Sequence, residues 1–96
     1  MSAGDRPTGG VSYEVLHQRA RELIDAGALP VADPCYMYGG WGIGRNCELC
    51  GSPVTSKEIE YELEFETANE QPTRKFLLCL HLGCHAIWDY ERKRSR

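Results

Sequence analysis

Apolar and acidic residues alternate without interruption over residues 58–66, the most regular stretch of the chain. Single glutamates separate the apolar positions Ile59, Tyr61, Leu63 and Phe65. Because successive side chains of a strand point to opposite faces, this pattern predicts a half-buried strand. We expect its apolar face to lie on the core and its glutamate face to lie in water.

A second strand is predicted over residues 74–80, which lead directly into His81. The residues between the two strands, 67–73, contain Asn69 and Pro72 and are typical of a turn. We therefore expect the two strands to pair as an antiparallel hairpin.

Two helices are predicted from apolar residues spaced three and four positions apart. For the first helix, Ser12 is placed to act as the N-cap and Gly27 to end it. The second covers about 82–92 and turns Ile87 and Trp88 inward. The first helix has an apolar stripe that consists of Tyr13, Leu16, Ala20, Leu23 and Ile24. This stripe must pack on the rest of the chain or on another copy, so a homodimer through this helix is one expectation.

Residues 31–46 show neither the helical nor the strand period. They combine Pro34 and four glycines with the aromatic residues Tyr36, Tyr38 and Trp41. Glycine and proline interrupt regular structure, so we interpret this stretch as an ordered but irregular loop.

Chain length and composition indicate one small domain with a marginal core. A chain of 96 residues with ten glycines and five prolines can bury only a small core, and such chains often need a disulfide, a metal or a partner subunit for stability. The five cysteines could supply a disulfide or a metal site. No apolar run has the length of a signal peptide or of a membrane span, so we expect a cytoplasmic protein without a membrane partner. Thiols stay reduced in that compartment, and closely spaced cysteines there indicate metal or redox chemistry.

Two pairs of potential metal ligands occur in the chain, each separated by two residues. The first is Cys47 and Cys50, followed by Gly51, and the second is His81 and Cys84 at the expected start of the second helix. Mixed thiolate and imidazole ligands at this spacing are typical of structural zinc. Four protein ligands leave no position for a catalytic water, so we predict one structural Zn²⁺.

Two neighbouring residues are alternative ligands. Cys79 could replace His81, and His85 could replace Cys84. Strand periodicity groups Cys79 with Leu77, and a closely spaced ligand pair at a helix start brings both donors to one side more easily. The first set is therefore favoured, while sets that use Cys79 or His85 remain open.

The order of knuckle, hairpin and helix resembles the treble-clef arrangement of LIM-type fingers over residues 47–90. The series Cys-x-x-Cys-Gly, a Glu-Tyr-Glu strand, then His-x-x-Cys-His-x-x-Trp and a charged helix is similar to a group of small bacterial zinc-finger proteins. This resemblance implies a fold and a metal but no activity. Unlike the LIM pattern, no second zinc module follows.

The expected fold class is α+β: an N-terminal helix, an irregular glycine and aromatic loop, then a treble-clef-like zinc knuckle, a β-hairpin and a C-terminal helix. The chain divides accordingly into four parts. These are a disordered N-terminus (1–11), a helix plus irregular loop (12–46), a zinc-binding unit (47–92) and a basic tail (93–96).

Our leading functional hypothesis is a zinc-stabilised module that binds another protein. It rests on the closed metal site, the acidic strand face and the aromatic loop. No nucleophile and base are recognisable, so we expect no enzyme; a nuclease-like or redox activity is the least favoured alternative. The candidate partner-binding residues are Tyr36, Tyr38, Trp41 and Arg45.

Nucleic-acid binding is the main alternative. The net charge of −3 offers no general basic footprint, yet four of the last five residues are basic. Together with Arg45, Arg74 and Lys75, this tail could contact phosphates.

Overall fold

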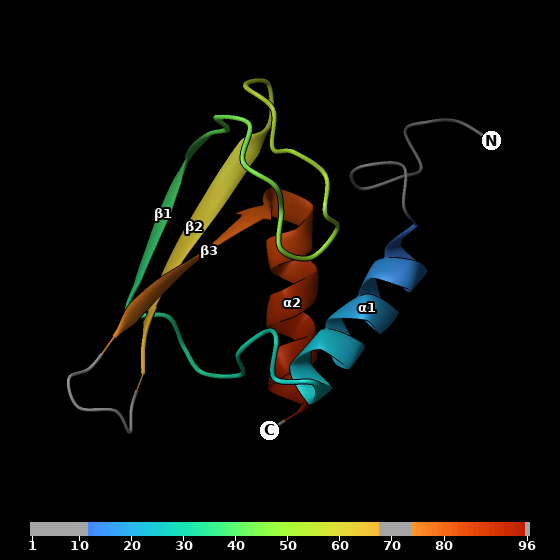
Figure 1. The fold of residues 1–96 in the computed structure, drawn as a ribbon. Coiled ribbons are helices and arrows are strands. Elements are labelled where there is room, and N and C mark those ends of the chain that lie inside the picture. The colour runs from blue at the N-terminus through green and yellow to red at the C-terminus, as the bar shows by residue number, and fades with distance from the viewer. Residues whose placement is uncertain (1–11, 68–73, 96) are drawn as a thin grey trace.

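The computed structural model describes residues 12–67 and 74–95. The N-terminus predicted to be disordered and most of the predicted turn at 67–73 lie outside these residues. The described part contains two helices and a three-stranded antiparallel sheet, which confirms the α+β class (Figure 1). No helix within it is long and apolar enough to cross a membrane. The elements are α1 (Tyr13–Asp25), β1 (Tyr36–Trp41), β2 (Ile59–Glu66), β3 (Lys75–His81) and α2 (Leu82–Arg94).

Helix α1 begins and ends where the sequence predicts. The Ser12 side chain accepts a hydrogen bond from the Val15 backbone N–H at 3.3 Å, and Gly27 follows the helix with φ of 77°, which glycine adopts without strain. The predicted stripe is used inside the chain, because its buried residues pack against α2. A homodimer through α1 would have to use the exposed positions of the helix, such as Tyr13, and it stays a prediction. The buried residues of α1 are Leu16, Ala20 and Ile24.

The molecule is layered, with α2 lying between the sheet and α1 (Figure 1). Strand β2 is central and pairs with β3, which places Leu63 beside Leu78 and Phe65 beside Phe76. The Phe65 ring meets the Trp88 ring edge to face, with centroids 6.0 Å apart. The predicted hairpin is thus present, and its apolar face covers α2.

Strand β1 corrects the expectation of an irregular loop over 31–46. It pairs antiparallel with β2 along its whole length, from Tyr36 opposite Glu64 to Trp41 opposite Ile59. Two consecutive glycines weaken the strand pattern in the sequence, which is why periodicity missed it. One of them, Gly39, lies beneath the Tyr61 ring, where an added Cβ would approach Cε1 to 3.3 Å.

The glutamate face of β2 also differs from expectation, because it is covered and does not simply face water. Glu60 is only 8% exposed, and side chains from outside the strand lie across the row. The covering residues are Arg45, from the segment before the first cysteine pair, and Lys75, from β3.

Candidate metal centre

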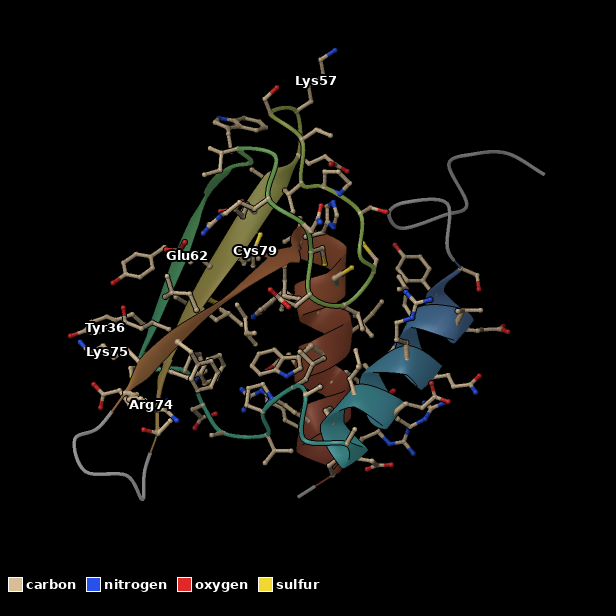
Figure 2. All side chains as sticks on the ribbon, viewed as in Figure 1. Tyr36, Lys57, Glu62, Arg74, Lys75 and Cys79 are labelled. Atoms are coloured by element: carbon tan, nitrogen blue, oxygen red, sulfur yellow. The ribbon has the colours of Figure 1, made fainter. Side chains whose placement is uncertain are left out.

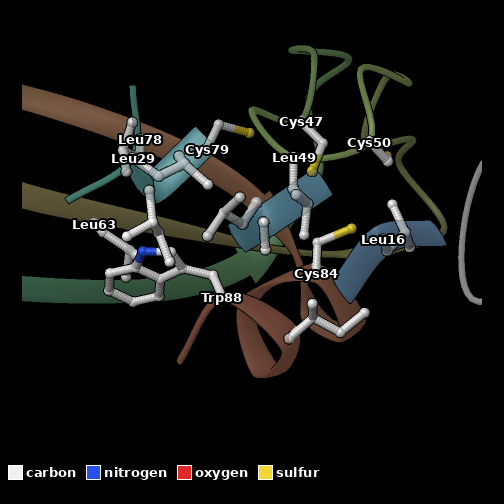
Figure 3. Close-up of a cluster of buried hydrophobic side chains, with 14 of the residues drawn as sticks. Leu16, Leu29, Cys47, Leu49, Cys50, Leu63, Leu78, Cys79, Cys84 and Trp88 are labelled. Carbon is white, nitrogen blue, oxygen red and sulfur yellow. The ribbon is translucent and has the colours of Figure 1, made fainter. Parts of the chain in front are cut away.

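The four ligands predicted from spacing lie together at one end of the core. The donor atoms of Cys47, Cys50, His81 and Cys84 are all within 4.8 Å of one another, and each residue is buried. The three cysteines sit at the edge of the apolar cluster shown in Figure 3. A buried set of three sulfurs and one imidazole could hold a metal ion.

A tight turn presents the first cysteine pair. The Gly51 N–H donates to the Cys47 carbonyl at 2.9 Å, and the Cys47 N–H donates to the Ser52 carbonyl at 2.9 Å. Gly51 has φ of 81°, a conformation that side chains other than glycine rarely adopt. The turn is attached to the sheet, because the Glu48 N–H donates to the Cys79 carbonyl at 2.9 Å.

His81 joins the sheet to the helix, since it ends β3 and is the N-cap residue of α2. Its Nδ1 lies 3.4 Å from the Cys50 sulfur. Its Nε2 lies 3.2 Å from the Pro53 carbonyl and 3.3 Å from the Glu58 carboxylate. A metal on Nδ1 would leave the hydrogen on Nε2, where both oxygens accept it and fix the orientation of the ring.

The surroundings of Cys47 favour its thiolate form. Its pKa is lowered to about 4, chiefly by a hydrogen bond with Cys84. Backbone hydrogen bonds from Cys50, His81 and Leu49 lower it further, against the opposing effect of burial. These donors therefore stabilise the Cys47 thiolate, which is the form in which a cysteine binds metal.

The alternative ligand Cys79 lies outside the cluster. Burial raises the pKa of its thiol to about 12, and the neighbouring Glu60 carboxylate adds to the effect. A thiol that keeps its proton is a poor ligand, so the environment that favours Cys47 as a ligand disfavours Cys79.

The second alternative, His85, is also outside the cluster and packs among aromatic rings. Its ring centroid is 4.7 Å from that of Tyr61 and 5.8 Å from that of Trp88. Burial lowers the pKa of this imidazole below its ordinary value. The ring therefore contributes to packing between the sheet and α2.

The predicted partner-binding residue Arg45 is engaged inside the molecule. Its Nη2 donates to Glu60 and, at 2.6 Å, to Glu62. The Arg45 hydrogen bond is the main reason why the pKa of Glu60 lies below its ordinary value. Lys75 pairs with the same row at Glu64, 3.6 Å away. These ion pairs neutralise much of the acidic face that we expected in water.

The three predicted aromatic residues lie on β1 and are open to solvent. Trp41 is 67% exposed, and the Tyr36 and Tyr38 rings stack with centroids 6.2 Å apart. Figure 2 shows Tyr36 projecting from the sheet, away from the metal cluster. Two further exposed apolar residues are Met37, which lies with Trp41 on the face of the sheet opposite to the two tyrosines, and Ile43 just after the strand. Sequence reasoning missed them because it assigned no strand here.

The predicted basic tail begins as part of α2, which continues to Arg94. Arg92 is only 6% exposed; it stacks over the Trp88 ring and pairs with Asp33 at 2.7 Å and Asp89 at 2.8 Å. Lys93 also pairs with Asp89, at 3.0 Å, but its side chain is exposed. Of the tail bases that we expected to be available to phosphates, Arg92 is therefore engaged inside the fold, and Arg96 lies outside the described residues.

A groove of about 640 Å³ runs between α1 and α2. The Glu91 carboxylate lies within it, and its side chain is only 1% exposed. His17 and Arg21 approach one of its oxygens to 2.6 and 3.2 Å, and Arg94 is 3.8 Å from the other. These contacts tie α1 to α2, and sequence reasoning missed them, because the partners in α1 and α2 lie some seventy positions apart.

No known protein family, curated protein or solved structure matches this chain. The cluster of Cys47, Cys50, His81 and Cys84 is therefore the main guide to its function.

Proposed function

We propose that the cluster of Cys47, Cys50, His81 and Cys84 holds one structural Zn²⁺. Three sulfurs and one imidazole nitrogen form a donor set typical of zinc, which prefers such mixed ligands in tetrahedral geometry. All four positions would be filled by protein, and the donors are buried. The ion would then stabilise the fold and activate no water.

The order of elements supports a treble-clef-like zinc finger. A knuckle carries the first two ligands, β2 and β3 follow, and α2 carries the last ligand in its first turn. This order accords with the resemblance to small bacterial zinc-finger proteins. Zinc contributes about 10–16 kcal/mol in comparable peptides, more than the net stability of most small domains. We therefore expect the half of the chain around the ligands to depend on the ion.

The zinc-stabilised fold would serve to bind another protein, and the exposed aromatic surface on β1 carries this proposal. Tyr36, Tyr38 and Trp41 are about half or more exposed, although large aromatic side chains usually bury their area. Aromatic side chains are enriched in protein interfaces. We define the β1 surface as the exposed residues on both faces of this edge strand and just after it: Tyr36, Met37, Tyr38, Trp41 and Ile43.

Nucleic-acid binding is less well supported by the same contacts. Arg45, Lys75 and Arg92 all pair with carboxylates, so contact with phosphate would first have to break those pairs. The lack of an enzymatic activity and a cytoplasmic location both stay predictions.

Metal content tests the first part of the proposal. The protein should carry one zinc per chain when it is purified without added metal. Cys84→Ser should lose both the ion and the folded far-UV circular dichroism spectrum, whereas the matched Cys79→Ser variant should retain them. A wild-type protein that is folded without metal would overturn the assignment.

Capture of partners from native lysate tests the second part. Zinc-loaded wild-type protein is compared with the double variant Tyr38→Ser, Trp41→Ser and with the control Tyr90→Ser, which removes an exposed aromatic ring from α2. The proposal requires partners that are lost with the double variant and kept with the control. Equal capture by all three proteins would count against it.

A further inference from the structure

Strand β1 has an open outer edge. The Gly42 N–H donates to the Glu58 carbonyl at 2.9 Å and continues the ladder with β2, so the even-numbered backbone groups face β2. The N–H and C=O groups of Met37, Gly39 and Trp41 therefore point outward. Within residues 12–67 and 74–95, no backbone hydrogen bond is found for them beyond the sheet.

The opposite edge of the sheet, at β3, is protected. The Glu48 N–H donates a hydrogen bond to the Cys79 carbonyl, which is therefore not free to pair with another strand. Lys75 adds a charge at the start of β3. Folded proteins usually guard an edge with such covering, with charges or with proline. Strand β1 has none of these, and all six of its residues are exposed. The β3 edge is protected against pairing, whereas the β1 edge is unprotected and carries exposed aromatic residues. This difference indicates that β1 pairs with a strand of a partner.

We propose that a second copy of this chain pairs with β1, antiparallel, around a two-fold axis at Gly39. The inference rests on the proposed function, because it names the partner of the β1 surface. Two three-stranded sheets would join into one continuous sheet of six strands. Such a contact is isologous, since each copy contributes the same residues.

The sequence of β1 is complementary to itself in this register. Gly39 lies opposite Gly39 of the second copy, and Tyr38 lies opposite Gly40 of the second copy. A Cβ added at Gly40 would meet nothing within 4 Å, so an aromatic ring has room above it. Rings that pack across the strands onto glycine are a known means of stabilising sheets.

The remaining positions also fit. Met37 lies opposite Trp41 of the second copy, which pairs two exposed apolar side chains. All three outward-pointing residues exchange backbone hydrogen bonds in this register, so the whole strand is used. No charged residue lies in Tyr36–Trp41, so self-pairing brings no like charges together.

Opposite charges placed on the axis test the proposal. Gly39→Lys and Gly39→Glu are each measured in the zinc-loaded full chain by sedimentation equilibrium over a wide range of concentration. Wild type should form dimers, and each variant alone should weaken dimerisation by more than about tenfold, because it places like charges face to face. An equimolar mixture of the two variants should restore the dimer, since the introduced ammonium and carboxylate groups then meet across the axis.

Two further variants protect the test against misfolding and against another interface. The double variant Met37→Lys, Trp41→Lys changes only exposed side chains and should also dissociate the dimer. Val15→Lys adds the same charge on the exposed face of α1 and should leave the dimer intact.

Two outcomes would overturn the proposal. In the first, wild-type protein with a full complement of zinc remains monomeric at every concentration; partner capture by the β1 surface then still decides the proposed function. In the second, the dimer is broken by Val15→Lys but not by the changes at Met37, Gly39 and Trp41.

Discussion

The imidazole of His81 lies between the cluster and Glu58: Nδ1 faces the Cys50 sulfur, while Nε2 is 3.3 Å from the Glu58 carboxylate. Such an outer carboxylate makes a histidine a stronger ligand and holds its ring in place. Glu58 also accepts the Thr55 N–H at 2.9 Å, which positions the carboxylate.

The first prediction concerns this outer contact. Glu58→Gln should weaken zinc binding by about tenfold, the lower end of the usual effect of such partners, because the Pro53 carbonyl still accepts from Nε2. Competition against a chromophoric chelator measures the change. Glu48→Gln is the matched control, since it removes an exposed carboxylate from the knuckle. Equal affinities of the two variants would show that Glu58 does not support the ligand.

The second prediction concerns thiol reactivity. With zinc bound, an alkylating agent should modify only the exposed Cys35 rapidly, because the ligand thiolates are buried and coordinated. After chelation at neutral pH, the other four cysteines should also react, because the half of the chain that holds them depends on the ion for its fold. Mass spectrometry of the digested protein identifies the modified positions. Rapid labelling of Cys79 in the zinc-loaded protein would contradict the environment described for it.

The third prediction concerns the pair between Arg45 and Glu60. Arg45→Ala leaves a buried carboxylate without its main partner and should lower the free energy of unfolding by about 1–3 kcal/mol. Lys75→Ala, which removes a more exposed partner of the same row, should cost less than about 1 kcal/mol. Urea unfolding of the zinc-loaded proteins measures both.

The same pair also sets a pH dependence. The pKa of Glu60 is lower in the folded protein than its ordinary value of 4.5. Its stabilising effect is therefore present above about pH 4.5 and is lost as the pH falls through the folded pKa. The difference in stability between wild type and Arg45→Ala should shrink over that acidic range. A constant difference would show that Arg45 acts through packing.

The fourth prediction concerns the contact between the helices. Glu91→Gln keeps the shape of the side chain but removes the charge that His17 and Arg21 bind. It should lower the free energy of unfolding by about 1.5–3 kcal/mol, as expected for a hydrogen bond to a charged group. Glu22→Gln, on the exposed side of α1, is the control and should change stability by less than about 0.5 kcal/mol.

Local signals in the sequence were enough for much of the fold. The alternation around Leu63 predicted β2, and Ser12 and Gly27 predicted the ends of α1, because these signals act between near neighbours in the chain. The ligand spacing was informative for the same reason, since a knuckle or a first helical turn brings two donors together.

Features that depend on distant residues were not predictable in this way. Strand β1 is defined by its pairing with β2, and its own residues show no alternation. Arg45 reaches Glu60 from an irregular segment, so the glutamates looked like a solvated face. The position of α1 against α2 follows from contacts such as His17 with Glu91, which no periodic pattern contains.

The ligands come from two places that the chain must first bring together. One pair ends at Cys50, and the other begins at His81, so the whole β2–β3 hairpin lies in the loop that the ion closes. Closing a loop of this length costs entropy, and a bound ion offsets that cost only in the folded state. With the proposed Zn²⁺ as that ion, folding and binding would form a single equilibrium, in which the folded fraction rises with free zinc concentration until the site is filled. The fraction of chains that is folded would then depend on the zinc supply of the surroundings.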